Sequence, residues 1–241
     1  MLVLGLLRLP HRVTCEARFV ETRSPFTASP IYRNKRMEIL SKMPTSNIKS
    51  AIGDFKKGKF VIVIDDRHRE NEADLVLAAE KVTPEKINFM IKYARGLVCV
   101  PMLGKRLDEL NLPLMTKVNT ELHHCKFTVS VDYKKGTTTG ISAFDRARTI
   151  KALIDKKTKP SGLAKPGHVF PLRCDEGGLR KRAGHTEAAV ELCKLANLYP
   201  AAVICEIIGE DGRMAKMAEI QKMAKKYNLK IIKIGELKCK E

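Results

Sequence analysis

At residues 60–74 the chain reads FVIVIDDRHRENEAD, an apolar run followed directly by charged residues. The run at 60–64 is rich in β-branched residues and predicts a buried strand. The ten residues after it include five acids and three bases. Carboxylates at that density are costly to bury unless a cation, a polar ligand or water compensates their charge. Magnesium with a phosphorylated substrate would satisfy both signs of charge, whereas a solvated connection after the strand is the commoner explanation of such a run.

Length and composition favour one large domain with a core of its own. The chain has 241 residues, is 44% hydrophobic and contains no Trp, so its core must consist mainly of aliphatic side chains. Over residues 47–241, strand-like and helix-like segments alternate. This pattern predicts an α/β fold, an α+β layered single domain in which helices pack on a mixed sheet.

The expected elements are defined by apolar runs and by helix start and stop signals. Thr83, Pro84 and Glu85 provide an N-cap, a first-turn proline and an acid for a helix that Gly96 can terminate. The predicted strands are residues 60–64, 97–101, 127–133, 201–208 and 229–234. The further predicted helices are residues 142–157, 186–197 and 217–227.

Residues 1–46 differ in composition from the rest of the chain. They are rich in Arg and poor in acids, which is typical of organellar transit peptides. A disordered extension, or a true start at Met37 or Met43, explains the same composition. We therefore assign 1–46 to an N-terminal extension outside the domain. The expected compartment is the cytoplasm, with an organelle as the alternative.

Charge and cysteine usage restrict the class of partner. The net charge of +18 favours anionic partners, but the lysine pairs lack the interleaved aromatic residues that stack on nucleic-acid bases. No apolar run approaches the ~20 residues of a membrane span. We therefore expect neither a nucleic acid nor a membrane as partner.

The seven cysteines form no C-x-x-C pair. Cys99, Cys193 and Cys205 lie in apolar runs, which is typical of buried free thiols and favours a reducing compartment.

Two glycine-containing clusters stand at expected element boundaries. Residues 136–142 read GTTTGIS, in which glycines permit close backbone approach and hydroxyls supply neutral donors and acceptors. Such clusters also form ordinary turns and caps. Residues 182–187 read RAGHTE before a predicted helix, where the helix start and Arg182 favour a phosphate. His185 would lie beside that anion and could bind a metal together with a carboxylate, while capping by Thr186 is the structural alternative.

Two further residues are candidate acids or bases. Pro166, Gly167 and Pro171 predict a stiff, irregular loop that would position His168, although a lone histidine is more often structural than catalytic. Glu206 lies in the apolar run 201–208, which predicts a buried acid. Burial favours the protonated form of a carboxylate and makes it a candidate general acid or base. A structural ion pair is the alternative.

These clusters, in this order, resemble the 3,4-dihydroxy-2-butanone 4-phosphate synthase family of riboflavin biosynthesis over residues 48–237. The motifs that carry the resemblance are DDxxRENExD at 65–74, GTTTGISA at 136–143 with Asp145-Arg146, PGHVFPLR at 166–173, RxGHTE at 182–187 and Cys205-Glu206. One departure is Ala183, where the family often has Gly; its methyl group would crowd the phosphate loop without removing a chemical group. Many members are fused to GTP cyclohydrolase II, and we expect this chain to be the monofunctional form.

The resemblance implies a lyase that converts D-ribulose 5-phosphate to L-3,4-dihydroxy-2-butanone 4-phosphate and formate. It implies two Mg²⁺ (or Mn²⁺) per site, with Glu70 and His185 as ligands, no organic cofactor, and a homodimer with sites close to the subunit interface. The catalytic residues that it implies are His168, Glu206 and Asp65. The substrate-binding residues that it implies are Arg69, Glu70, Asp74, Thr139, Arg182, Ala183, Gly184, His185 and Thr186, with Glu72 and Cys99 also lining the pocket.

The residue types fit this reaction. Enolisation of a ketose needs a base that removes a carbon-bound proton, and a divalent metal stabilises the negative charge that develops. Loss of water then needs an acid, and the sequence leaves open which of Asp65, Glu70 and Glu206 moves which proton. A basic nucleic-acid-binding protein would explain the charge but not the acids. A sugar-phosphate sensor without catalysis would not need the complete set of chemical residues.

Overall fold

The computed structural model describes residues 45–66 and 69–238. Most of the expected N-terminal extension therefore lies outside the described residues. No helix within the described ranges is long and apolar enough to cross a membrane.

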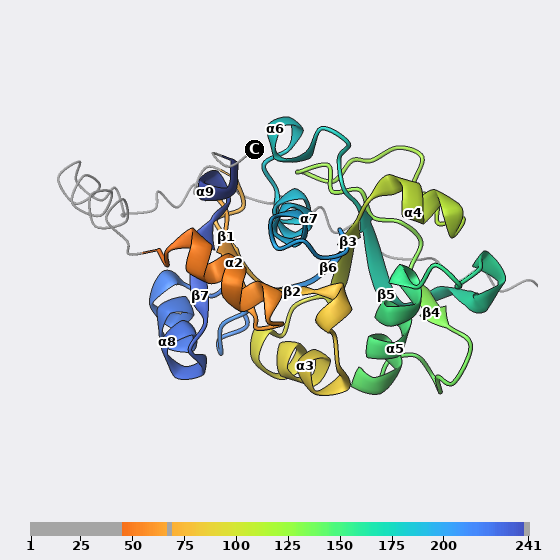
Figure 1. The fold of residues 1–241 in the computed structure, drawn as a ribbon, viewed down its shortest axis with the longest axis horizontal. Helices are drawn as coiled ribbons and strands as arrows, with labels where there is room; N and C mark the ends of the chain where they lie inside the picture. Colours follow the sequence, from red (N-terminus) through yellow and green to blue (C-terminus); the bar gives the residue numbers. More distant parts are fainter. Residues whose placement is uncertain (1–44, 67–68, 239–241) are drawn as a thin grey trace, which may run out of the picture. The chain divides into compact units, whose positions relative to one another are not determined.

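A mixed seven-stranded sheet forms the centre of the described domain (Figure 1). In chain order the strands are β1 (Val61–Ile64), β2 (Ala73–Ala78), β3 (Cys99–Met102), β4 (Val131–Tyr133), β5 (Leu163–Arg173), β6 (Ala202–Glu206) and β7 (Lys230–Lys233). Their spatial order is β4-β5-β3-β6-β2-β1-β7. The pairs β1/β7 and β3/β5 are parallel, and the other neighbours are antiparallel. The predicted mixed sheet is therefore confirmed.

Helices cover both faces of this sheet. In chain order they are α2 (Ile48–Lys56), α3 (Pro84–Phe89), α4 (Gly104–Glu109), α5 (Ala143–Ile154), α6 (Gly178–Lys181), α7 (His185–Leu195), α8 (Met217–Tyr227) and α9 (Ile234–Lys238). One cluster of buried side chains joins α3, α5 and α8 to the sheet, and a second joins α2, α7 and α9 to it. In Figure 1, α3, α5 and α8 lie along the lower side of the sheet and α7 lies on the other side. The helices and the sheet thus form three layers, as expected for an α/β domain.

The predicted helix start at Thr83 is confirmed. The Thr83 side chain accepts a hydrogen bond from the backbone N–H of Lys86 at 3.3 Å, and Pro84 is the first helical residue. After α3 the chain continues through a single π-helical turn, Met90–Ala94, and the helix ends at Arg95 in the left-handed conformation with φ 73°. The helix therefore ends one residue before Gly96, which the sequence predicts as its terminator.

The prediction of an irregular loop around His168 is wrong, because these residues belong to β5. The register between β4 and β5 shifts: Val131 pairs with Val169, whereas Asp132 pairs with Ala164. Residues 165–168 therefore bulge out of the ladder, and prolines are compatible with a strand at such a bulge. Pro171 further along pairs with Val100, and its carbonyl accepts the backbone N–H of Thr128.

Two other strands differ from expectation. The predicted strand at 127–133 is shortened to β4, because residues 127 and 128 form only isolated bridges. Strand β2 lies where the sequence pattern predicts no element. All six of its residues are buried, so both of its faces are covered and the alternation of an amphipathic strand is absent.

Candidate active site

The charged run after β1 is organised by the carboxylate of Asp65. One of its oxygens accepts hydrogen bonds from the backbone N–H of Glu70 (3.0 Å) and from the guanidinium of Arg69 (3.1 Å). The other accepts the backbone N–H of Glu72 at 2.9 Å. Asn71 takes a left-handed conformation with φ 57°, which asparagine tolerates better than most residues. Asp65 therefore folds the run back between the antiparallel strands β1 and β2 and fixes the position of Glu70.

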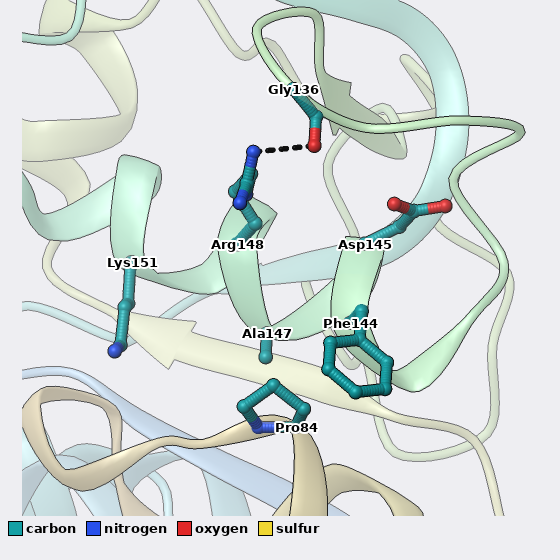
Figure 2. Close-up of a pocket in the computed structure, with 7 residues that line it drawn as sticks. All are labelled: Pro84, Gly136, Phe144, Asp145, Ala147, Arg148 and Lys151. Carbon is teal, nitrogen blue, oxygen red and sulfur yellow. Dashed lines mark hydrogen bonds between the residues drawn. The ribbon is translucent and has the colours of Figure 1, made fainter.

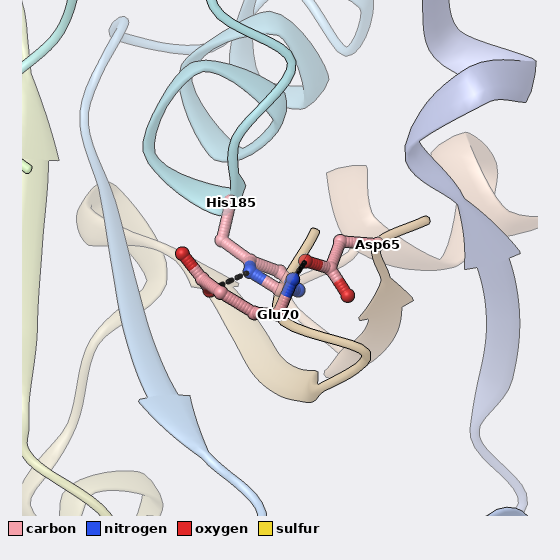
Figure 3. A group of neighbouring side chains, drawn as sticks. All are labelled: Asp65, Glu70 and His185. Atoms are coloured by element: carbon pink, nitrogen blue, oxygen red, sulfur yellow. Dashed lines mark hydrogen bonds and ion pairs between the residues drawn. The ribbon is translucent and has the colours of Figure 1, made fainter. Parts of the chain in front are cut away.

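Glu70 meets His185 across the site (Figure 3). His185 is the first residue of α7, and its Nδ1 lies 3.5 Å from Oε2 of Glu70. Asp65, Glu70 and His185 each offer one ligand atom, and these atoms lie within 4.8 Å of one another. The Nε2 atom of His185 is buried and has no hydrogen-bond partner. Two carboxylates and an unpartnered imidazole nitrogen form a donor set that fits a divalent cation.

The charges around this cluster shift the protonation of its members. Burial acts to raise the pKa of Glu70, but the hydrogen bond to His185 and the charge of Arg69 outweigh it and lower this pKa to about 2. Burial acts to lower the pKa of His185, but Asp74 and Glu70 overcome it and raise this pKa to about 9. Burial raises the pKa of Asp74 to about 7. Burial and the nearby Glu70 also raise the pKa of Glu72.

The sheet register places two further predicted residues next to this cluster. Asp74 on β2 pairs directly with Glu206 on β6, and side chains of directly paired residues lie on the same face of a sheet. That face is the one that packs against α7, because Val76 and Ile204, two residues along each strand, belong to the α7 core cluster. Oδ1 of Asp74 is buried without a hydrogen-bond partner. Carboxylates from three segments are thus concentrated at the N-terminal end of α7.

Glu206 differs from its predicted environment. It is the last residue of β6 and is half-buried, so the prediction of a buried acid is wrong. Its Oε2 accepts the backbone N–H of Leu97 at 2.7 Å. The strand ends where the polar site begins, which leaves this carboxylate partly accessible to a ligand.

Gly96 has a role that the sequence does not reveal. A Cβ at this position would lie 2.4 Å from Oε2 of Glu206 and 2.5 Å from its carbonyl oxygen. Only glycine allows the two backbones to approach this closely. In the sequence an isolated glycine at the end of a helical pattern resembles a simple helix stop.

The RAGHTE segment forms the start of α7. Gly184 is the N-cap residue and provides no side-chain cap, so the alternative of capping by Thr186 is wrong; Thr186 lies buried in the first turn. Arg182 forms an ion pair with Glu187 at 2.7 Å, and its Nε donates to the carbonyl of His123 at 3.2 Å. Ala183 is exposed. These two contacts therefore fix the Arg182 guanidinium beside the N-terminus of α7.

Thr139 and His168 form a second group. Within the described ranges no hydrogen bond or ion pair joins either of them to the cluster of Asp65, Glu70 and His185. His168 lies on the bulge of β5, with Nδ1 2.7 Å from Oδ2 of Asp132. Thr139 lies in the loop before α5.

The loop that carries Thr139 is held by α5. The Asp145 carboxylate accepts hydrogen bonds from the backbone N–H of Thr138 and of Gly140, each at 3.1 Å. Arg148 donates to the carbonyl of Gly136 at 2.5 Å, as Figure 2 shows. A hollow of about 250 Å³ lies below this contact, lined by Pro84, Phe144 and Lys151 among others. None of the predicted site residues lines it, so this hollow is not the candidate site.

Comparison with known proteins identifies the family. The protein-family model described as 3,4-dihydroxy-2-butanone 4-phosphate synthase matches residues 49–239.

The chain belongs to the 3,4-dihydroxy-2-butanone 4-phosphate synthase family.

The family resemblance expected from the motifs is thereby confirmed. The 3,4-dihydroxy-2-butanone 4-phosphate synthase of Agrobacterium fabrum is 49% identical over 195 residues, which are 81% of this chain and 92% of the relative. The riboflavin biosynthesis protein RibBA of Endomicrobium trichonymphae is 59% identical over 192 residues, 80% of this chain, but the match spans only 48% of that relative. The match spans 34–49% of the length of the RibBA relatives.

A solved structure shares the fold. A 3,4-dihydroxy-2-butanone 4-phosphate synthase in complex with two magnesium ions is 44% identical, with a TM-score of 0.74, and the match covers 80% of this chain and 94% of that one.

Proposed function

We propose that this chain is a 3,4-dihydroxy-2-butanone 4-phosphate synthase, a carbon–carbon lyase of riboflavin biosynthesis. It would convert D-ribulose 5-phosphate to L-3,4-dihydroxy-2-butanone 4-phosphate and formate by enolisation, dehydration, skeletal rearrangement and loss of formate. The observation that carries the proposal is the group of Asp65, Glu70 and His185 next to the paired Asp74 and Glu206. Family membership supports the reaction class.

The proposed metal is Mg²⁺ (or Mn²⁺), with two ions per active site and no organic cofactor. Glu70 and His185 would be ligands, which the unpartnered Nε2 atom and the neighbouring carboxylates support. A bound divalent cation would stabilise negative charge that develops on the oxygens of the substrate. A relative with two magnesium ions is consistent with this stoichiometry.

Several residues of the chain would bind the substrate. Arg182, held by Glu187 beside the start of α7, would bind the phosphate together with the backbone of residues 183–186. Arg69 is held by the Asp65 and Glu70 carboxylates and would contact the polar end of the sugar. Asp74 and Thr139 are proposed to bind hydroxyl groups.

Proton transfer would fall to one residue beside this group, Glu206, and to one residue of the second group, His168. Glu206 and His168 are proposed as acid–base residues, since both are partly exposed and can reach a ligand. Asp65 is proposed to contribute its charge at the metal. Its three hydrogen bonds to the loop show that it also fixes Glu70.

We also propose that the chain forms a homodimer and binds neither nucleic acid nor membrane. Ile141 and Phe144, two and five positions after Thr139, are 52% and 69% exposed, and large apolar side chains exposed so close together along the chain support a protein interface. Sedimentation equilibrium would test this: a single species of twice the chain mass supports it, and a monomer at micromolar concentration contradicts it.

The compartment proposed is the cytoplasm, with an organelle as the alternative. The alternative requires that residues 1–46 act as a transit peptide. Imaging of these residues fused to a fluorescent protein, in cells of the source organism, would distinguish the two.

The function is tested by formate release from D-ribulose 5-phosphate with magnesium or with EDTA. Wild-type protein should release formate only with the metal. Glu70→Gln and His185→Ala should reduce kcat by at least about 100-fold, because each would remove a ligand of the proposed metal, whose stabilisation of developing charge is worth several kcal/mol. Glu176→Gln, which changes an exposed acid outside the site, is the matched control and should retain wild-type activity. Substrate binding without formate release by folded wild type would instead indicate a sensor.

A further inference from the structure

Asp132 makes two hydrogen bonds to a single residue, His168. Oδ1 accepts the backbone N–H of His168 at 3.0 Å, and Oδ2 lies 2.7 Å from the Nδ1 atom of its ring. The Asp132 side chain is 14% exposed and the His168 side chain is 42% exposed. The carboxylate is therefore sheltered, while the imidazole is open to a ligand.

This arrangement fixes the tautomer of His168. An ionised carboxylate can only accept hydrogen bonds, so Nδ1 must carry the proton that bridges to Oδ2. In the neutral ring Nε2 is then the lone-pair nitrogen. The free nitrogen is thus a proton acceptor.

The backbone around the pair is built to bring these two residues together. Asp132 is at the register shift of β4, and His168 is in the matching bulge of β5; such bulges redirect a side chain. A Cβ on Gly167 would lie 2.0 Å from the carbonyl carbon of Val131 and 2.2 Å from the backbone nitrogen of Asp132. The close approach of the two strands at this point therefore depends on glycine.

The loop of Thr139 packs against the same carboxylate. Gly140 has φ 95°, and a Cβ on it would lie 2.1 Å from Oδ2 of Asp132. Asp132 is consequently enclosed between the bulge that carries His168 and the loop that carries Thr139. Both of those residues are predicted from the family motifs, whereas Asp132 is not.

We propose that Asp132 is a positioning residue that holds His168 as an Nδ1–H tautomer with Nε2 free to exchange protons with the substrate. This inference rests on the proposed function, in which His168 is an acid–base residue. Nε2 would take a proton from a C–H or O–H group of the sugar phosphate and form an imidazolium. Asp132 would stay ionised and stabilise that charge, and Nε2 would then return the proton to a departing hydroxyl or to water.

A purely structural role for Asp132 is the competing explanation, because Oδ1 also holds the backbone of the bulge. The variant Asp132→Asn separates the two. Its carbonyl can still accept the N–H of His168, but its amide can donate to Nδ1 and so favours the opposite, Nε2–H tautomer. Asp155→Asn is the matched control, since Asp155 also accepts one backbone N–H, from Lys157 at 2.9 Å, in an exposed turn.

The first readout is the ring ¹⁵N shifts of His168 in the neutral imidazole of wild type, with the signals assigned by their loss in His168→Gln. We expect the Nδ1–H tautomer to predominate in wild type and in Asp155→Asn, and the Nε2–H tautomer in Asp132→Asn. Formate release is the second readout, and kcat of Asp132→Asn should fall by about 100-fold or more with KM within about threefold and an unchanged thermal midpoint.

Two results would overturn the role of Asp132: a predominant Nε2–H tautomer in wild type, or wild-type kcat in a folded Asp132→Asn. The wild-type spectrum decides the tautomer even where the variant fails to fold. Absence of formate release from wild-type protein with an Nδ1–H His168 would instead overturn the proposed function.

Discussion

Replacement of Gly96 by alanine tests how the fold positions Glu206. The added Cβ would lie 2.4 Å from Oε2 of Glu206 and 2.5 and 2.7 Å from its backbone oxygen and nitrogen. Backbone atoms of β6 cannot rotate away as a flexible side chain can, so the segment before β3 must move outward. Overpacking of this kind costs about 1–3 kcal/mol. The shift also weakens the hydrogen bond from Leu97 to Glu206, which is worth about 1 kcal/mol.

We therefore expect Gly96→Ala to lower the free energy of unfolding by about 2–4 kcal/mol. Urea unfolding followed by circular dichroism measures this, and formate release should fall in the same variant because Glu206 is displaced. Gly53→Ala is the control: Gly53 lies inside α2 with no atom within 4 Å of an added Cβ, so alanine should stabilise by about 0.5–1 kcal/mol. A Gly96→Ala protein within about 0.5 kcal/mol of wild type would refute the argument.

Three further predictions concern buried charge. Burial raises the pKa of Asp74 to about 7 from 3.8, so folding penalises its ionised form, and the free energy of unfolding of wild type should fall by an amount on the order of 4 kcal/mol between about pH 4 and 7. In urea unfolding at a series of pH values, Asp74→Asn should flatten this fall, and an unchanged slope in the variant would contradict the prediction. The pKa of His185 is raised to about 9, so in EDTA its contribution to stability is present below about pH 6.5 and is lost as pH rises through about 9. Melting scans at pH 6 and 10 should show this loss of stability in wild type and not in His185→Gln, and equal losses in both proteins would argue against the prediction. Arg106 is buried and caps the end of α5, where it donates to the carbonyls of Leu153 (2.9 Å) and Asp155 (2.6 Å). Calorimetry should show that Arg106→Met lowers the free energy of unfolding by about 3 kcal/mol and that the control Lys105→Met, at the exposed neighbouring residue, changes it little; equal effects of the two variants would count against this capping.

Sequence alone predicts those parts of the fold whose signals are local. The apolar run of β1, the N-cap at Thr83 and helix α8 at Met217–Tyr227 all appear where residue patterns place them. Their determinants lie within a few neighbouring residues: side-chain period, capping hydroxyls and the first-turn proline. The membership of the family follows from motifs in order, which need no three-dimensional information.

The remainder depends on contacts between distant segments. The ladder of β5 tolerates Pro166 and Pro171 because a bulge and the partner strands accommodate them, which no local rule for proline captures. Asp132 and Gly96 are ordinary residues in the sequence, and their importance becomes visible only when β4 meets β5 and when Gly96 meets β6. The site residues likewise fall into two groups, at His185 and at His168, a division that spacing along the chain cannot show.

Uniformly ¹³C-labelled D-ribulose 5-phosphate, followed by NMR with wild-type protein and magnesium, reports directly on the proposed reaction. We expect each substrate molecule consumed to give one labelled formate and one four-carbon phosphate, and EDTA to stop the formation of both. Complete recovery of the five-carbon sugar phosphate after incubation with folded, magnesium-loaded protein would contradict the proposed reaction.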